Sequence, residues 1–146
     1  MNNQIRHEPD DRPEAVRQAG AGARAWRAVV HAQQSATPDH ADFYALAAEL
    51  VDTLSSVSSL AGVLARQVET YAQRQPAGER VYDDSRTVDP VERLGDAAQA
   101  LRALHDIVGD DALRLVNGFW NAIGHIGVED IPGTDSGPVE DDGVSR

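Results

Sequence analysis

Apolar residues in the middle of the chain recur at alternating spacings of four and three residues, the pattern of an amphipathic helix. Thr37 is a plausible N-cap residue, with Pro38 and Asp39 in the first turn behind it. Gln75 and Pro76 end the pattern, so we expect one long helix over residues 38–75. Its repeating positions are Phe43, Ala47, Leu50, Leu54, Val57, Ala61, Leu64, Val68 and Tyr71.

A second pattern with the same spacing covers residues 90–127 and begins at Asp89 and Pro90, an N-cap residue followed by proline. Gly109 and the two aspartates after it leave two alternatives open. One continuous helix would pair with residues 38–75 as an antiparallel hairpin, whereas a break would fold a shorter helix back. The repeating positions are Leu94, Ala98, Leu101, His105, Val108, Ala112, Leu115, Phe119, Ala122 and Ile126.

A weaker pattern over residues 13–35 predicts an N-terminal helix. The fold class is therefore all-α, a helical bundle built on a long antiparallel helical hairpin, residues 38–75 with 90–127, plus this N-terminal helix. We expect a single domain over residues 13–128. The hairpin has a longer coiled-coil-like apolar seam than the N-terminal helix can cover, which favours a homo-oligomer.

Both ends of the chain are polar and predict disorder, residues 1–12 as an N-terminus and residues 129–146 as an acidic tail. That tail holds six acids and one arginine, nearly half of the net charge of −11. The chain has no cysteine and no lysine, so thiolate and Schiff-base chemistry are excluded. No apolar run is long enough to predict a membrane span, and we expect a cytoplasmic protein without a membrane partner.

The residue types of catalytic and metal sites occur without the spacings that such sites need. The five histidines form no i, i+4 pair, and no Glu-x-x-His motif occurs. We therefore predict no catalytic residue, metal ligand or cofactor, and the sequence favours a protein that is not an enzyme. One alternative stays open, a metal-dependent hydrolase similar to all-α nucleotide pyrophosphatases, which would use Glu49, Asp52 and the acids from Asp106 to Asp111.

Nucleic-acid binding is disfavoured, although Arg17, Arg24 and Arg27 surround Trp26. If residues 90–127 formed a helix-turn-helix, its second helix would begin with Asp110 and Asp111, which repel phosphates. A second alternative is an acidic inhibitor of a nucleic-acid-binding protein.

Aromatic and branched residues near the end of the second pattern are the candidate interaction residues. Phe119 and Ile126 lie on the seam, whereas Trp120 lies beside it, so Trp120 belongs either to the core or to an interface. The full set is Trp26, Phe119, Trp120, Ile123 and Ile126. The preferred hypothesis is a non-enzymatic helical protein–protein interaction module, acting as a scaffold, adaptor or small inhibitor on another protein or on itself.

Overall fold

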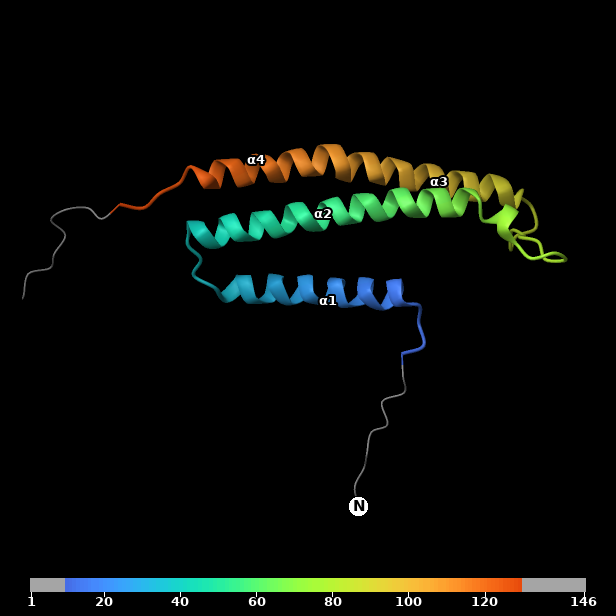
Figure 1. Cartoon of the computed structure of the whole chain (residues 1–146), viewed down its shortest axis with the longest axis horizontal. Helices are drawn as coiled ribbons and strands as arrows, with labels where there is room; N and C mark the ends of the chain where they lie inside the picture. The colour runs from blue at the N-terminus through green and yellow to red at the C-terminus, as the bar shows by residue number, and fades with distance from the viewer. Residues whose placement is uncertain (1–9, 130–146) are drawn as a thin grey trace, which may run out of the picture. The chain divides into compact units, whose positions relative to one another are not determined.

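The computed structural model describes residues 10–129, and in this range every regular element is a helix. The elements are α1 Glu14–Ser35, α2 His40–Glu69, the short 3₁₀ turn η1 Ala72–Arg74, α3 Pro90–Asp106, the π-helix η2 Ile107–Ala112 and α4 Leu113–Gly124 (Figure 1). The predicted all-α class, with a long hairpin and an N-terminal helix, is confirmed. The predicted disorder of the ends concerns residues that lie almost wholly outside this range.

The chain divides after Ala41 into two compact units, one holding α1 and the other holding the hairpin. In the first unit, α1 follows Pro13, contains no buried residue, and ends at Ser35 with extended backbone at Ala36. Pro13 suits this place because it lacks the N–H that a helix start leaves unpaired. The expectation of one domain over residues 13–128 stays a prediction.

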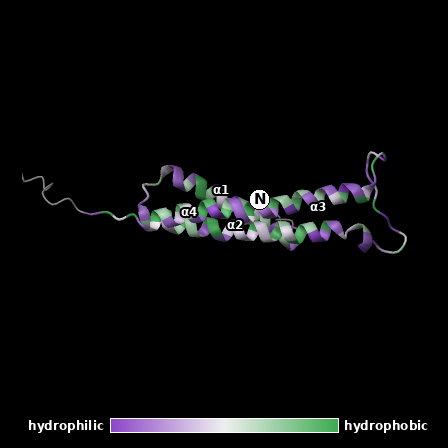
Figure 2. Cartoon of the chain, turned by 90° about the horizontal axis from the view of Figure 1, so that it is seen from above, coloured by the Kyte–Doolittle hydropathy of each residue, from purple (hydrophilic) through white to green (hydrophobic). Residues whose placement is uncertain are grey.

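The second unit is an antiparallel helical hairpin in which α2 lies beside α3, η2 and α4 (Figure 1). Three contacts fix the direction: Tyr44 with Trp120, Ser58 with His105, and Glu69 with Arg102. As the residue number rises along α2, that of the contacted residue falls, which is the antiparallel arrangement. Apolar residues recur along both helices of the hairpin (Figure 2).

Alanine, not a large side chain, occupies most of the buried positions among the described residues. Ala47 and Ala98 are 0% exposed, and Ala61 and Ala65 are 2% exposed. Within residues 10–129 the only other buried side chains are Val108 and Ser58. Because the alanine side chain is a single methyl group, these positions allow the two helix axes to approach closely. The larger apolar side chains then lie partly outside the contact between the helices.

The end of α3 and the start of α4 are joined without a break. Residues 90–124 form one continuous helical run that contains six residues of π-helix at 107–112. In this turn the Leu113 N–H bonds to the Val108 carbonyl, five residues back. The one-helix alternative is therefore correct, and Gly109 lies inside the π-helix. Asp89 caps the start as predicted, accepting from the Val91 N–H at 2.8 Å.

Helix α2 is shorter than predicted at both ends, since it begins at His40 instead of residue 38 and ends at Glu69 instead of residue 75. From Thr70 the backbone tightens into bonds three residues apart, with the Gln73 N–H donating to the Thr70 carbonyl at 3.2 Å. A 3₁₀ turn is a common end for an α-helix. By length and composition alone, α2 also meets the criterion for a membrane-spanning helix. The core helix of a soluble protein meets the same criterion, so this does not decide location.

The connection between the hairpin helices folds around Asp83, whose side chain is only 7% exposed. Its carboxylate accepts from the Ser85 hydroxyl, and from Arg93 Nε at 3.1 Å. These contacts lower the pKa of Asp83. The hydrogen bond from Ser85 has the larger effect, and the contact with Arg93 has the smaller one. The connection is thereby attached to the first turns of α3.

We expect the Asp83 contacts to contribute stability that is present above the ordinary pKa of 3.8 and is lost as the pH falls below it. The sign follows because a carboxyl whose pKa is lowered by folding must bind a proton less readily in the folded state. Denaturation of the protein and of Asp83→Asn at pH 6 and pH 3 measures this. The difference in unfolding free energy between the native chain and Asp83→Asn should be smaller at pH 3 than at pH 6. An equal difference at both pH values would contradict this prediction.

Candidate interaction surface

The middle of the hairpin is held by polar contacts between Ser58 of α2 and His105 of α3. The Ser58 hydroxyl donates to the His105 carbonyl at 3.0 Å, and His105 Nδ1 lies 2.8 Å from the Ser58 carbonyl oxygen. Because a carbonyl oxygen only accepts, Nδ1 carries the proton in this contact. His105 is hydrogen-bonded to a partner across the hairpin, but it is exposed and not partly buried as its place on the seam indicates.

Two glycines allow the helices to meet at this point. A Cβ atom on Gly109 would lie 2.8 Å from Ser58 Oγ, and one on Gly62 would lie 3.3 Å from His105 Nδ1. Among the four serines of this region, Ser58 is buried between the helices. Ser55, Ser56 and Ser59 instead bond to carbonyls of their own helix and remain exposed.

The π-helix changes which side of α4 faces α2. A turn closed by a bond five residues back holds one residue more than an α-turn, so every later position rotates by one residue. Up to its first turn, the predicted positions Ala98 and Val108 are buried. After it, the less exposed positions are Val116, Trp120 and Ile123, each one residue later than predicted.

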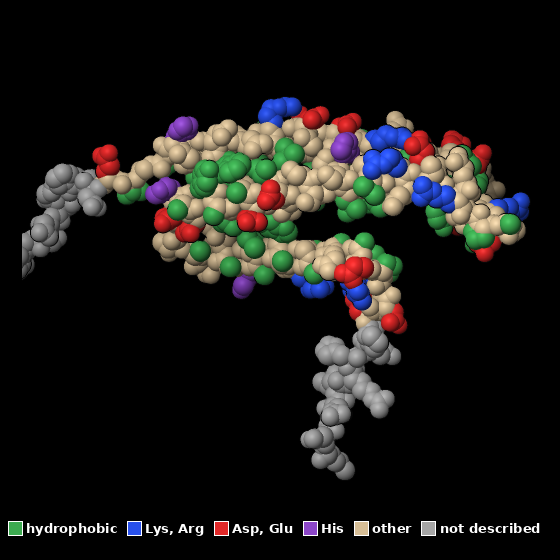
Figure 3. Space-filling view, viewed as in Figure 1, with side chains coloured by type: hydrophobic (Ala, Val, Ile, Leu, Met, Phe, Trp, Pro, Cys, Tyr) green, Lys and Arg blue, Asp and Glu red, His purple; other side chains and the backbone are tan. Residues whose placement is uncertain are grey.

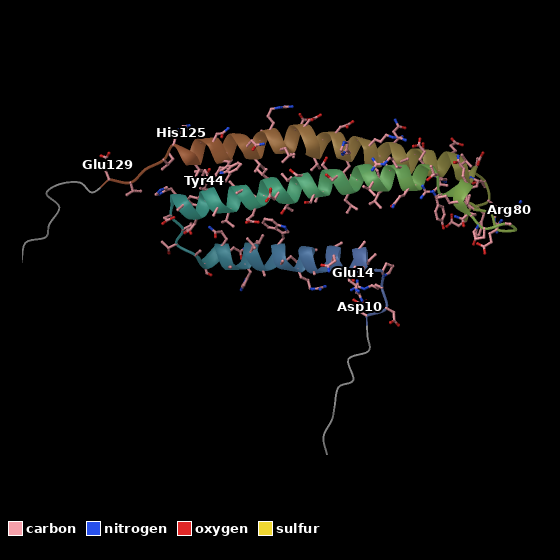
Figure 4. All side chains as sticks on the ribbon, viewed as in Figure 1. Asp10, Glu14, Tyr44, Arg80, His125 and Glu129 are labelled. Atoms are coloured by element: carbon pink, nitrogen blue, oxygen red, sulfur yellow. The ribbon has the colours of Figure 1, made fainter. Side chains whose placement is uncertain are left out.

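The predicted inward positions Leu115 and Phe119 are therefore wrong, and these side chains are 75% and 41% exposed. Ile126 is also wrong, since it lies beyond the end of α4 and is 54% exposed. Trp120 lies on the side facing α2, with its ring centroid 5.4 Å from that of Tyr44. Figure 4 shows Tyr44 near the start of α2, alongside the end of α4. The indole N–H of Trp120 is buried and has no hydrogen-bond partner among residues 10–129, so this ring contributes packing.

Four exposed apolar side chains, three on α2 and one just beyond its end, form one stripe. Val57, Leu60, Leu64 and Tyr71 repeat at spacings of three, four and seven, and they are 41%, 48%, 37% and 52% exposed. This spacing places them on one side of the helix. Val57, Leu60 and Leu64 each directly precede a buried residue, namely Ser58, Ala61 and Ala65.

A second stripe runs along α3, η2 and α4 and ends just beyond α4. It is formed by Leu104, Ile107, Leu115, Phe119 and Ile126, all exposed. The step from Ile107 to Leu115 is eight residues, one more than a heptad, because it crosses the π-helix. Here too a stripe residue directly precedes an inward one, as in Ile107 and Val108 or Phe119 and Trp120.

The two stripes lie on the same side of the hairpin. In both helices the stripe is displaced by one residue toward the N-terminus from the positions that face the other helix, and the helices are antiparallel. Two antiparallel helices are related by a two-fold axis that runs between them, normal to the plane in which both helix axes lie. This axis exchanges the helices without exchanging the two sides of the pair. Positions with the same displacement in both helices therefore lie on the same side. We call this surface, formed by the two stripes, the apolar side of the hairpin. Figure 3 shows hydrophobic side chains gathered over α2 and α4.

Of the predicted interaction residues, Phe119 and Ile126 belong to the apolar side, whereas Trp120 and Ile123 face α2. Trp26 is partly exposed and lies on α1, in the other unit. Sequence reasoning missed Leu60, Leu104 and Ile107 as candidates. Their exposure depends on which neighbouring positions the second helix covers.

The carboxylates of the hydrolase alternative do not form a metal site within the described range. Over residues 10–129, no three His, Asp or Glu side chains are placed so that they could hold a metal ion. Comparison with protein-family models, curated proteins and solved structures finds no match to this chain.

Proposed function

We propose that this protein is a non-enzymatic helical interaction module that associates with a second copy of itself through the apolar side of the hairpin. The observation that carries the proposal is the exposure of nine large apolar side chains on one side of a hairpin whose buried positions are mostly alanine. Contiguous apolar patches of this kind mark interaction surfaces in soluble proteins.

The size of the surface suits a dimer. The stripe that begins at Val57 is about 20 Å long, the stripe from Leu104 to the end of α4 is about 30 Å long, and each helix is about 10 Å wide. The contacts of Ser58 with His105 and of Tyr44 with Trp120 place the two stripes mostly in opposite halves of the hairpin. The apolar side thus covers roughly 500 Å², or about 1,000 Å² over two copies, the lower limit of a specific interface. A surface built from two antiparallel helices is also suited to an isologous contact, because stacking two copies gives a four-helix bundle.

The mass of the full chain in solution tests this proposal. We expect a dimer in sedimentation or light scattering at micromolar concentration. Leu60→Glu places a charge in the centre of the interface and should weaken association by about 30-fold or more, as for an interface residue worth about 2 kcal/mol. Ser59→Glu is the matched control, since it adds the same charge one position away, outside the apolar side, and should leave the mass unchanged.

A monomer at all concentrations would overturn the proposal. Equal effects of Leu60→Glu and Ser59→Glu would show that association uses another surface. Helical content should be compared by circular dichroism in both variants, so that loss of association is separated from loss of folding.

A further inference from the structure

Arg86, in the connection between the hairpin helices, has a backbone conformation that its residue type disfavours. Its φ angle is +59°, and within residues 10–129 it is the only residue other than glycine with a positive φ. A Cβ atom makes this left-handed region unfavourable, so glycine would be less strained here. The guanidinium carbon of Arg86 lies 4.1 Å from the centre of the Tyr82 ring, a cation–π contact. Strained residues of this kind occur often where ligands bind.

Two open cavities lie along the same connection. The smaller has a volume of about 360 Å³, and its lining includes Arg80, Tyr82, Asp83 and Arg86. The larger, of about 520 Å³, shares the first three of these residues and adds Leu94 of α3. The two cavities adjoin because they share part of their lining, and both volumes are typical of sites for small molecules. Figure 4 shows Arg80 on the connection.

The smaller cavity carries positive charge that no neighbouring carboxylate balances. Asp83 is the one acid in its lining, and this carboxylate already accepts from Ser85 and from Arg93 Nε. Arg93 thus balances the charge of Asp83. Arg80 and Arg86, in contrast, form no ion pair within the described range. Two unpaired guanidinium groups attract an anion, since each offers several N–H donors in one plane.

We propose that the connection binds a small phosphate monoester, whose phosphate contacts Arg80 and Arg86 in the smaller cavity and whose apolar part occupies the larger one. A phosphate monoester carries a charge of about −1.5 to −2 at neutral pH, which matches two unpaired arginines. The larger cavity suits the apolar part, because it offers Leu94 and the Tyr82 ring, and Asp84 in its lining would repel the phosphate. This site does not depend on self-association.

Calorimetric titration of the full chain with phenyl phosphate tests the proposal. Inorganic phosphate, which has the charge without the ring, and benzoate, which has the ring with a single charge, are the comparison probes. Each should bind about tenfold more weakly than phenyl phosphate, the effect of losing a partly buried ring or a charge-assisted contact. Equal affinity of benzoate and phenyl phosphate would overturn the assignment of a phosphate, and equal affinity of the two phosphates would overturn the role of the larger cavity.

Arg86→Gly separates binding from folding. Glycine adopts a φ of +59° without strain, so this variant should be at least as stable as the native chain, whereas its affinity for phenyl phosphate should fall by about tenfold or more. Arg80→Gln should have the same effect on affinity at a position without backbone strain.

Arg114→Gln is the matched control, because it removes an arginine of α4 that lines neither cavity. It should leave the affinity unchanged. An equal loss in Arg114→Gln and Arg86→Gly would show an effect of net charge and overturn the site. No heat from phenyl phosphate at millimolar concentration would also overturn it, while the mass of the chain in solution tests self-association separately.

Discussion

Gly109→Ala should lower the free energy of unfolding by about 1–3 kcal/mol, the range for inserting a methyl group into a closely packed site. The added Cβ would lie 2.8 Å from Ser58 Oγ, closer than the two atoms can approach. The serine is 5% exposed and bonded to the His105 carbonyl, so it cannot move without losing that bond. Chemical denaturation followed by circular dichroism measures the change.

Gly95→Ala is the control for this substitution. Gly95 is also helical, in α3, but its Cβ would meet nothing within 4 Å. The control should be more stable than the native chain by up to about 1 kcal/mol, because alanine favours helix over glycine. If Gly109→Ala were equally stabilising, the close contact at Ser58 would be wrong. In a Ser58→Ala background the cost at Gly109 should shrink, as expected for two residues in contact.

Val116→Asp and Leu115→Asp should have very different effects on stability, although the two residues are adjacent. Val116 lies four residues before Trp120, on the side of α4 that faces α2, and Leu115 is 75% exposed. An unpaired charge at Val116 should cost about 3 kcal/mol or more, whereas the same charge at Leu115 should change the stability of the monomer by less than about 0.5 kcal/mol.

Denaturation at a concentration low enough to keep the chain monomeric measures both variants. Leu115→Asp should instead weaken self-association, which sedimentation at higher concentration detects. The uninterrupted heptad pattern of the sequence predicts the opposite order of stabilities. A result in which Leu115→Asp is the more destabilising variant would show that the π-helix does not rotate α4.

Short-range signals in the sequence correctly predicted where the helices lie. Pro13, and Asp89 with Pro90, mark the starts of α1 and α3, and the period of apolar residues predicts α2 and the run from residue 90 to 124. Each of these signals acts within one turn or along one helix. They needed no knowledge of what lies on the other side of the hairpin.

The candidate surface was predicted only in part for the opposite reason. Phe119 and Ile126 were named as interaction residues but placed on the inward seam, and Trp120 could be assigned to neither core nor interface. The structure reverses the positions of Phe119 and Trp120, since only the π-helix determines which of them faces α2. The proposed self-association uses the side of the hairpin on which this reversal places Phe119.

The amino-acid sequence by itself determined the all-α class, the hairpin and the starts of α1 and α3, because capping residues and apolar periodicity act over distances of a few residues. Tertiary structure alone decided the rotation of α4 and the composition of the apolar side. The site of that rotation, around Gly109, packs against Ser58, which also bonds to His105 47 positions away. A contact between positions so distant in the chain leaves no trace in the local spacing of apolar residues. The extra residue of the π-helix beside it turns Leu115 and Phe119 outward.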